Sequence, residues 1–204
     1  MTDRSDPKTE KVLPRTAGGP LSALALSPAK AVAAIVIGAV AGMLTLTRAD
    51  DAAPWVGVVL AMALAWCAMI YIDRYRLPDL LTLPMIACGL LYCWVHDAPQ
   101  LPHHLIGAAA GYLSLVAVSE AYRFLRKRDG LGRGDAKLLA AAGAWLGWKA
   151  LPFVVLAGSV GALIIVVFLA LARGRTALAR PLPFGPFLAA AFIALWIWQP
   201  LPLA

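Results

Sequence analysis

The sequence predicts an all-α fold, a polytopic bundle of about seven membrane segments, and three observations support this prediction. The 204 residues are 61% hydrophobic and only 14% charged, with a mean hydropathy of +0.77, well outside the usual balance of a soluble globular domain. Several apolar runs approach the roughly 20 residues that a helix needs to cross a bilayer. Basic residues are concentrated in every second connection between these runs, which is the positive-inside pattern.

The seven expected segments cover residues 31–47, 55–72, 80–95, 104–122, 136–148, 151–172 and 184–199. The fifth segment has about 13 residues, so we expect it either to extend at its ends or to cross only part of the membrane. The charged stretches between segments are short, which predicts one membrane-embedded domain over residues 30–204. Residues 1–29 begin with a polar stretch rich in Pro and Gly, and we expect them to form a disordered cytoplasmic tail.

The distribution of positive charge predicts an orientation and a partner. If the N-terminal tail is cytoplasmic, all of the 18 Lys and Arg residues except Arg48 and Lys149 lie on the inner side. The net charge of +7 is therefore expected to face anionic lipid headgroups, and we predict membrane lipids and no nucleic acid as partners.

The cysteine and histidine pattern gives no indication of a metal site. Cys67, Cys88 and Cys93 lie in apolar runs without a CxxC pair, and neighbouring histidines His103 and His104 point apart on a helix. We therefore expect neither a metal nor a cofactor.

Carboxylates at inner membrane boundaries are the candidate functional residues. Asp73 ends the second segment in AMIYIDRYRLPD, and Asp135 opens the fifth in GRGDAKLL. The two residues share a membrane face on separate helices, so their side chains could meet across the bundle. A pair of carboxylates can hydrolyse a peptide without a metal, because the ionised one activates a water while the protonated one polarises the scissile carbonyl.

The glycines that precede Asp135 are a second candidate feature. Gly130, Gly132 and Gly134 would let the loop backbone approach the membrane surface and a substrate strand closely. Together with Lys137 they are the expected support of the loop and the substrate.

Structural roles fit the same carboxylates. Asp135 and Asp79 each stand before an apolar helix and would make good N-caps, and Asp73 could pair with Arg74 or Arg76. A proton-coupled carrier would also place carboxylates in or near the bilayer, although more often at the midplane and with repeated halves. Spacing alone leaves these interpretations open.

Three motifs resemble one known family. GLGRGDAKLLAAAGAWLGW is similar to the GxGD signature of the type IV prepilin peptidases, which are bacterial intramembrane aspartyl proteases. IDRYRLPDLLTLP is similar to their first aspartate motif, and RPLPFGPFLAAA resembles their closing P-F-G-P block. The motifs stand in the family's order between about residue 66 and residue 191.

The resemblance implies an activity and a location. The expected activity is an endopeptidase that removes the basic leader from prepilins or pseudopilins of a type IV pilus, type II secretion or tight-adherence system. The resemblance implies cleavage after a glycine at the start of the substrate's hydrophobic segment, with Asp73 and Asp135 as the catalytic pair. The expected location is the bacterial inner membrane, with the active site at the cytoplasmic face.

The chain departs from the family pattern in two places. The first catalytic aspartate of the family usually stands eight residues before the aspartate or asparagine of the LPD element, whereas Asp73 stands six before Asp79 and Tyr71 occupies the eighth position. We assign catalysis to Asp73 because Asp79 follows Pro78 as a natural helix cap, and the alternative is an inactive scaffold for pilus assembly. Many members also carry a domain with paired CxxC motifs, associated with zinc and N-methylation, so we expect a short form that has the protease core.

The helix ends predict different protonation of the two catalytic carboxylates. Asp135 begins a helix, where the dipole and unpaired N–H groups favour the ionised form, and Asp73 ends one. We therefore expect Asp135 to act as the base toward water and Asp73 to donate a proton to the carbonyl.

Overall fold

The computed structural model describes residues 25–46, 54–74, 77–127, 132–173 and 183–198, and all regular structure in these ranges is helical. The helices are α1 (Pro28–Leu46), α2 (Pro54–Arg74), α3 (Asp79–His96), the 3₁₀ turn η2 (Ala98–Gln100), α4 (Leu101–Arg126), α5 (Arg133–Leu146), the 3₁₀ turn η3 (Trp148–Ala150), α6 (Leu151–Arg173) and α7 (Gly185–Trp198). Each α-helix coincides with one expected segment to within a few residues, which confirms the all-α prediction. The expected disordered tail falls mostly on residues 1–24, which lie outside the described ranges.

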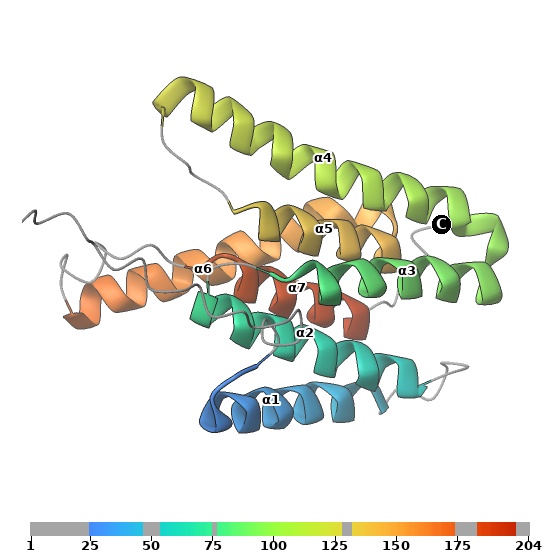
Figure 1. Ribbon diagram of the computed structural model, residues 1–204, viewed down its shortest axis with the longest axis horizontal. Coiled ribbons are helices and arrows are strands. Elements are labelled where there is room, and N and C mark those ends of the chain that lie inside the picture. Colours follow the sequence, from blue (N-terminus) through green and yellow to red (C-terminus); the bar gives the residue numbers. More distant parts are fainter. Residues whose placement is uncertain (1–24, 47–53, 75–76, 128–131, 174–182, 199–204) are drawn as a thin grey trace, which may run out of the picture.

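The α-helices alternate in direction along the bundle. Figure 1 shows the starts of α1, α3, α5 and α7, and the ends of α2, α4 and α6, nearer the left of the view. Lys30, Asp73, Asp79, Arg126 and Arg133 belong to these helix ends. Most charged residues of the described helices therefore gather at one end of the molecule, and Lys149 of η3 lies at the other. This is the alternating path that the charge pattern predicts.

The chain is a multi-pass membrane protein. Among the described residues, five helical stretches are long and apolar enough to cross a membrane: α1, α2, α3, η2 with α4, and η3 with α6. Helix α7 is a shorter apolar helix. Large apolar side chains on their outer faces, such as Ile35, Val36 and Phe168, are exposed where a bilayer would surround them.

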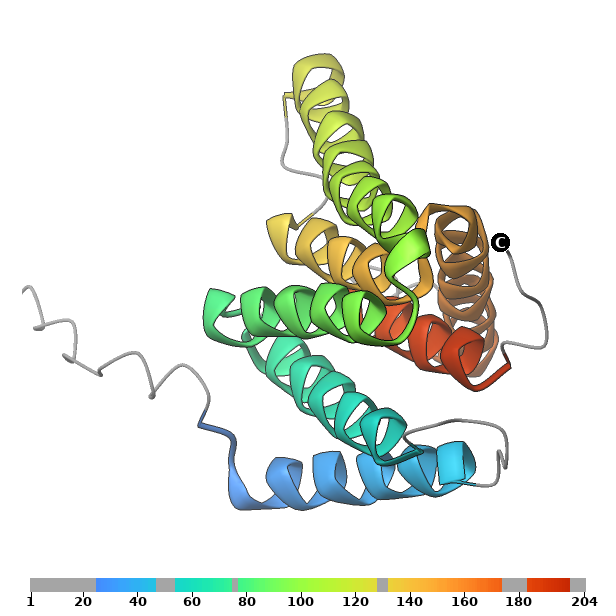
Figure 2. The same ribbon diagram turned by 90° about the vertical axis from the view of Figure 1, so that its right-hand side faces the viewer.

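Helix α5 is short because it does not face lipid. Its 14 residues span about 21 Å, less than the roughly 30 Å of a bilayer core. Every residue from Leu138 to Leu146 is buried, and Figure 2 shows α5 between α4, α3, α6 and α7. The short fifth segment is therefore an internal helix enclosed by longer ones.

Glycines allow pairs of helices to pack closely. A Cβ on Gly143 of α5 would lie 2.2 Å from the carbonyl oxygen of Gly107 on α4, and one on Gly111 would lie 2.6 Å from the carbonyl of Leu139. A Cβ on Gly38 of α1 would lie 2.6 Å from Met62 Sδ on α2. In lipid, small residues drive association because they allow backbones to approach closely.

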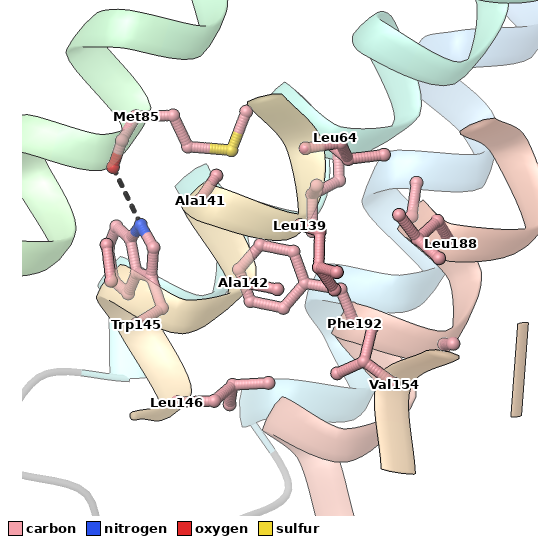
Figure 3. Packing of buried hydrophobic residues seen from close by; sticks show 14 of the residues in the cluster. Leu64, Met85, Leu139, Ala141, Ala142, Trp145, Leu146, Val154, Leu188 and Phe192 are labelled. Atoms are coloured by element: carbon pink, nitrogen blue, oxygen red, sulfur yellow. Dashed lines mark hydrogen bonds between the residues drawn. The ribbon is translucent and has the colours of Figure 1, made fainter. Parts of the chain in front are cut away.

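The core surrounds α5, as Figure 3 shows. Leu139 packs among fully buried side chains of neighbouring helices, including Leu64, Leu188 and Phe192. The indole Nε1 of Trp145 donates a hydrogen bond of 2.8 Å to the carbonyl oxygen of Met85, which links α5 to α3. These contacts hold α5, and with it the glycine-rich turn at its start, in a fixed place.

Candidate active site

The GRGD turn forms the N-terminus of α5. Gly132 is the N-cap, α5 begins at Arg133, and Asp135 is the third helical residue. The backbone N–H of Asp135 donates to the carbonyl oxygen of Gly132 at 3.0 Å, and the N–H of Gly132 donates to the Asp135 carboxylate. An acidic third residue that bonds back to the N-cap is the second half of a capping box. Asp135 therefore stabilises the helix start while it remains available as a reactive group.

The carboxylate of Asp135 is almost completely buried. The residue is 1% exposed, and its Oδ1 atom has no hydrogen-bond partner among the described residues. The hydroxyl group of Tyr71, from α2, donates to the same carboxylate. Tyr71 is 5% exposed, so this bond lies inside the protein.

Burial determines the protonation of Asp135. Desolvation raises its pKa from an ordinary 3.8 to about 6, although the hydrogen bonds from Tyr71 and Gly132 lower it in part. Asp135 lies outside the five candidate spans. Burial thus shifts the pKa in the direction opposite to that expected from the helix N-terminus, although the carboxylate is still ionised above about pH 6. The expected role of Asp135 as the base toward water stays a prediction.

Glycines from two of the three sequence motifs pack against the ring of Tyr71. A Cβ on Gly132 would lie 3.0 Å from the Tyr71 hydroxyl oxygen, and one on Gly134 would lie 3.2 Å from Tyr71 Cε2. A Cβ on Gly185, from the P-F-G-P block, would lie 2.9 Å from the same ring. The glycines thus leave room for a tyrosine at the centre of the site, and Gly130 lies outside the described residues.

Asp73 lies on a different side of α2. Its carboxylate forms an ion pair with Lys30 of α1, and the two side chains are 36% and 38% exposed. Residues two apart on a helix point about 200° apart, so Tyr71 and Asp73 face opposite ways. The structure brings Tyr71 to Asp135 and places Asp73 beside α1.

Two of these contacts were not expected from the sequence. For the contact of Tyr71 with Asp135 the sequence held one indication, because Tyr71 stands eight residues before Asp79, where the family usually has its first aspartate. For the ion pair of Lys30 with Asp73 the sequence held no indication, because the two residues are 43 positions apart and meet only through the packing of α1 against α2.

Asp79 does not cap α3 with its side chain. The N-cap is Pro78, whose carbonyl oxygen accepts from the N–H groups of Leu81 and Thr82 at 3.1 and 3.5 Å. Asp79 is already the first helical residue, and its carboxylate pairs with Lys137 of α5. The capping role expected for Asp79 is thus replaced by a link between α3 and α5, and Lys137 is engaged in that link.

An apolar groove of about 430 Å³ runs between α2 and α3. Trp55, Val59, Leu80, Leu91 and Trp145 are among its lining residues, and neither Asp73 nor Asp135 lines it. Within the part of the chain that the structure describes, no three His, Cys, Asp or Glu side chains come together in a way that could hold a metal.

Comparisons with known proteins add to this geometry. Residues 58–167 match the model of the type IV leader peptidase family, a range that includes Tyr71, Asp73 and Asp135. No solved structure matches the chain significantly.

Three relatives show the extent of the similarity. The chain is 42% identical over 159 residues to a prepilin leader peptidase/N-methyltransferase of Aeromonas hydrophila, covering 76% of this chain and 53% of the relative. It is 50% identical over 129 residues to a protein of the same name from Burkholderia pseudomallei, covering 62% of this chain and 41% of the relative. It is 48% identical over 122 residues to leader peptidase HopD of Escherichia coli, covering 59% of this chain and 78% of the relative.

The chain spans about half the length of the Aeromonas relative. The match to the family model nevertheless covers more than half of this chain, and it contains the GxGD turn and the motif that ends in LPD. The chain therefore belongs to the type IV leader peptidase family.

Proposed function

We propose that the protein is a membrane endopeptidase that removes the basic leader from type IV prepilins or pseudopilins, with Asp135 and Asp73 as its two carboxylates. The observation that carries this proposal is the state of Asp135, a buried carboxylate whose Oδ1 has no partner among the described residues. An unsatisfied buried polar atom costs about 1 to 3 kcal/mol, and such groups are concentrated at functional sites. Family membership and the names of the relatives supply the substrate class.

The chemistry follows from the two oxygens of Asp135. When ionised, Oδ1 accepts a proton from a water molecule as the water oxygen attacks the scissile carbonyl carbon. The second acid donates a hydrogen bond or a proton to the carbonyl oxygen and stabilises the negative charge that develops there. The proton held by Asp135 then passes to the leaving amine as the C–N bond breaks. Water is consumed, and both carboxylates return to their starting forms.

The role proposed for Asp73 requires a rearrangement. Asp73 is in the last turn of α2, and it pairs with Lys30 on the far side from Tyr71. Exposed ion pairs contribute only about 0 to 1 kcal/mol, so substrate binding can release this one. Rewinding of the last turn of α2 would then bring Asp73 toward Asp135.

The proposed location is the bacterial inner membrane with the N-terminus in the cytoplasm. The gathering of charged residues at one end of the helices supports this orientation, because positive residues stay inside. The basic residues there are proposed to contact anionic lipid headgroups.

Cleavage of purified prepilins tests the function. Full-length protein in lipid nanodiscs should cleave at least one member of a panel of purified prepilins after the glycine that precedes the hydrophobic segment. Asp135→Asn should lower kcat/KM about 1,000-fold or more, because the base is lost. Asp73→Asn should have an effect of similar size. The matched control is Asp97→Asn, at the opposite end of α3, which should cleave at the wild-type rate.

The possible outcomes separate the proposals. Cleavage retained in Asp73→Asn but lost in Asp135→Asn would remove Asp73 from the mechanism and leave Asp135 in place. A folded wild-type protein that cleaves no prepilin would instead favour an assembly scaffold, which is the alternative that the Lys30 ion pair of Asp73 supports.

A further inference from the structure

We propose that Tyr71 is a positioning residue for the reaction at Asp135: its hydroxyl holds one carboxylate oxygen and so presents Oδ1 to water. This inference rests on the proposed endopeptidase function. Tyr71 stands at the position, eight residues before Asp79, where the family pattern usually has its first aspartate. The role proposed for Tyr71 does not depend on which residue is the second acid.

The packing around Tyr71 holds its ring in one orientation. Gly185 of α7 lies against one part of the ring, and Gly134 of α5 lies against another. A Cβ placed on Gly132 would lie 3.0 Å from the Tyr71 hydroxyl oxygen. Because a buried ring with close contacts from two other helices cannot swing away, its hydroxyl points to a fixed place. Glycines from two of the sequence motifs therefore fix the direction of the Tyr71 O–H group.

The hydrogen bonds of Asp135 are one-sided. Both the Tyr71 hydroxyl and the Gly132 N–H donate to this carboxylate, yet Oδ1 has no partner among the described residues. The two donors therefore fall on Oδ2, which lies 3.7 Å from the position of a Cβ on Gly132. A carboxylate held through one oxygen cannot rotate, so the lone pairs of Oδ1 keep a constant direction. Fixing a base in this way is how positioning residues raise kcat without changing substrate binding.

Other charged groups near Asp135 are engaged with one another. On α3, Asp79 pairs with Lys137 of α5, and on α4, Glu120 pairs with Arg123. Helix α7 has no ionisable residue between Gly185 and Trp198. On α2, Asp73 pairs with Lys30 of α1. The remaining ionisable residues on the packed elements are Cys67 and Arg74 on α2, Cys88, Tyr92, Cys93 and His96 on α3, His103, His104, Tyr112, Tyr122 and Arg126 on α4, Arg133 at the start of α5, Lys149 in η3, and Arg173 at the far end of α6, and Tyr71→Phe alters none of them. A change in the titration of Asp135 in a Tyr71 variant is therefore attributable to the lost hydrogen bond.

Tyr71→Phe isolates the hydroxyl from the ring. The variant keeps the packing against the glycines and loses one donor to the ionised carboxylate, so the charged form of Asp135 becomes less favourable and its pKa rises. Because the base must be ionised, the acidic limb of the kcat/KM profile should move to higher pH by about one unit. We expect kcat to fall about 10- to 100-fold, while KM stays within about 2-fold of wild type.

The control and the rescue variant sharpen the test. Tyr112→Phe, on the exposed face of α4, should leave both the rate and the pH profile unchanged. Incorporation of 3,5-difluorotyrosine at position 71 keeps the ring and the hydroxyl but makes the O–H a stronger donor. The acidic limb should then move to lower pH, opposite to the shift in Tyr71→Phe.

Infrared titration of the carboxyl C=O band gives a readout that needs no cleavage. The band of Asp135 is assigned by its loss in Asp135→Asn, in the full-length protein in nanodiscs, and its midpoint should rise in Tyr71→Phe and fall with difluorotyrosine. An unchanged midpoint in both variants, or a Tyr71→Phe profile that superimposes on wild type, would overturn the proposal. Shifted midpoints in a protein that cleaves no prepilin would support the positioning of Asp135 and reject only the proposed endopeptidase function.

Discussion

Replacement of Gly143 by alanine should destabilise the protein by about 3 kcal/mol, because α4 and α5 would be forced apart. The added Cβ would lie 2.2 Å from the carbonyl oxygen of Gly107 and 2.3 Å from its carbonyl carbon. These are backbone atoms of a neighbouring helix, so no side-chain rotation relieves the contact. Reversible unfolding in mixed micelles, monitored by far-ultraviolet circular dichroism, measures the loss.

Gly161→Ala is the matched control for this substitution. Gly161 is also within a helix, but a Cβ there meets only Phe187 Cδ1 at 3.7 Å, an ordinary contact. Alanine should therefore be neutral there or stabilise by up to about 1 kcal/mol through its higher helix propensity. Equal stability of Gly143→Ala and Gly161→Ala would show that α4 and α5 are not in backbone contact.

Asp135→Asn should make the protein about 2 kcal/mol more stable at pH 7.5 and no more stable at pH 4. Burial raises the pKa of Asp135 from 3.8 to about 6, so the folded protein binds more protons than the unfolded chain between these values. Wild-type stability therefore falls as pH rises from about 4 to about 6 and stays lower above that range. A shift of about two units corresponds to about 3 kcal/mol, and part of the gain is lost because the new amide N–H₂ is also buried.

Unfolding at a series of pH values checks this expectation. The unfolding free energy of Asp135→Asn should exceed that of wild type by an amount that grows from pH 4 to pH 6. The difference between Asp97→Asn and wild type should stay constant over the same range. A difference that is constant with pH would mean that Asp135 titrates near its ordinary pKa. In combination with the loss of cleavage, greater stability without the carboxylate would show that Asp135 is retained at a cost to the fold.

The path of the chain was predictable because it depends on local hydropathy. Helices that must satisfy their own backbone in lipid begin and end where polar residues begin and end, so α2 and α6 were anticipated to within two residues at each end. A helix start at the GRGD sequence was also anticipated, but the expected N-cap, Asp135, is wrong: Gly132 is the N-cap and Asp135 is the third helical residue. Even the short length of α5 was visible, although its enclosure by longer helices was not.

The side of each helix that meets its neighbours was decided only by tertiary structure. A helix that is apolar all round, such as α7, carries no signal for its rotation, because lipid and a protein core favour the same side chains. The rotation of α2 places Tyr71 against Asp135 and Asp73 against Lys30, and a turn of half a circle would exchange them. The amino-acid sequence by itself determined the membrane segments, the charged end and the three motifs. Which carboxylate is buried, and which side chain donates to it, followed only from glycine contacts between helices far apart in the chain.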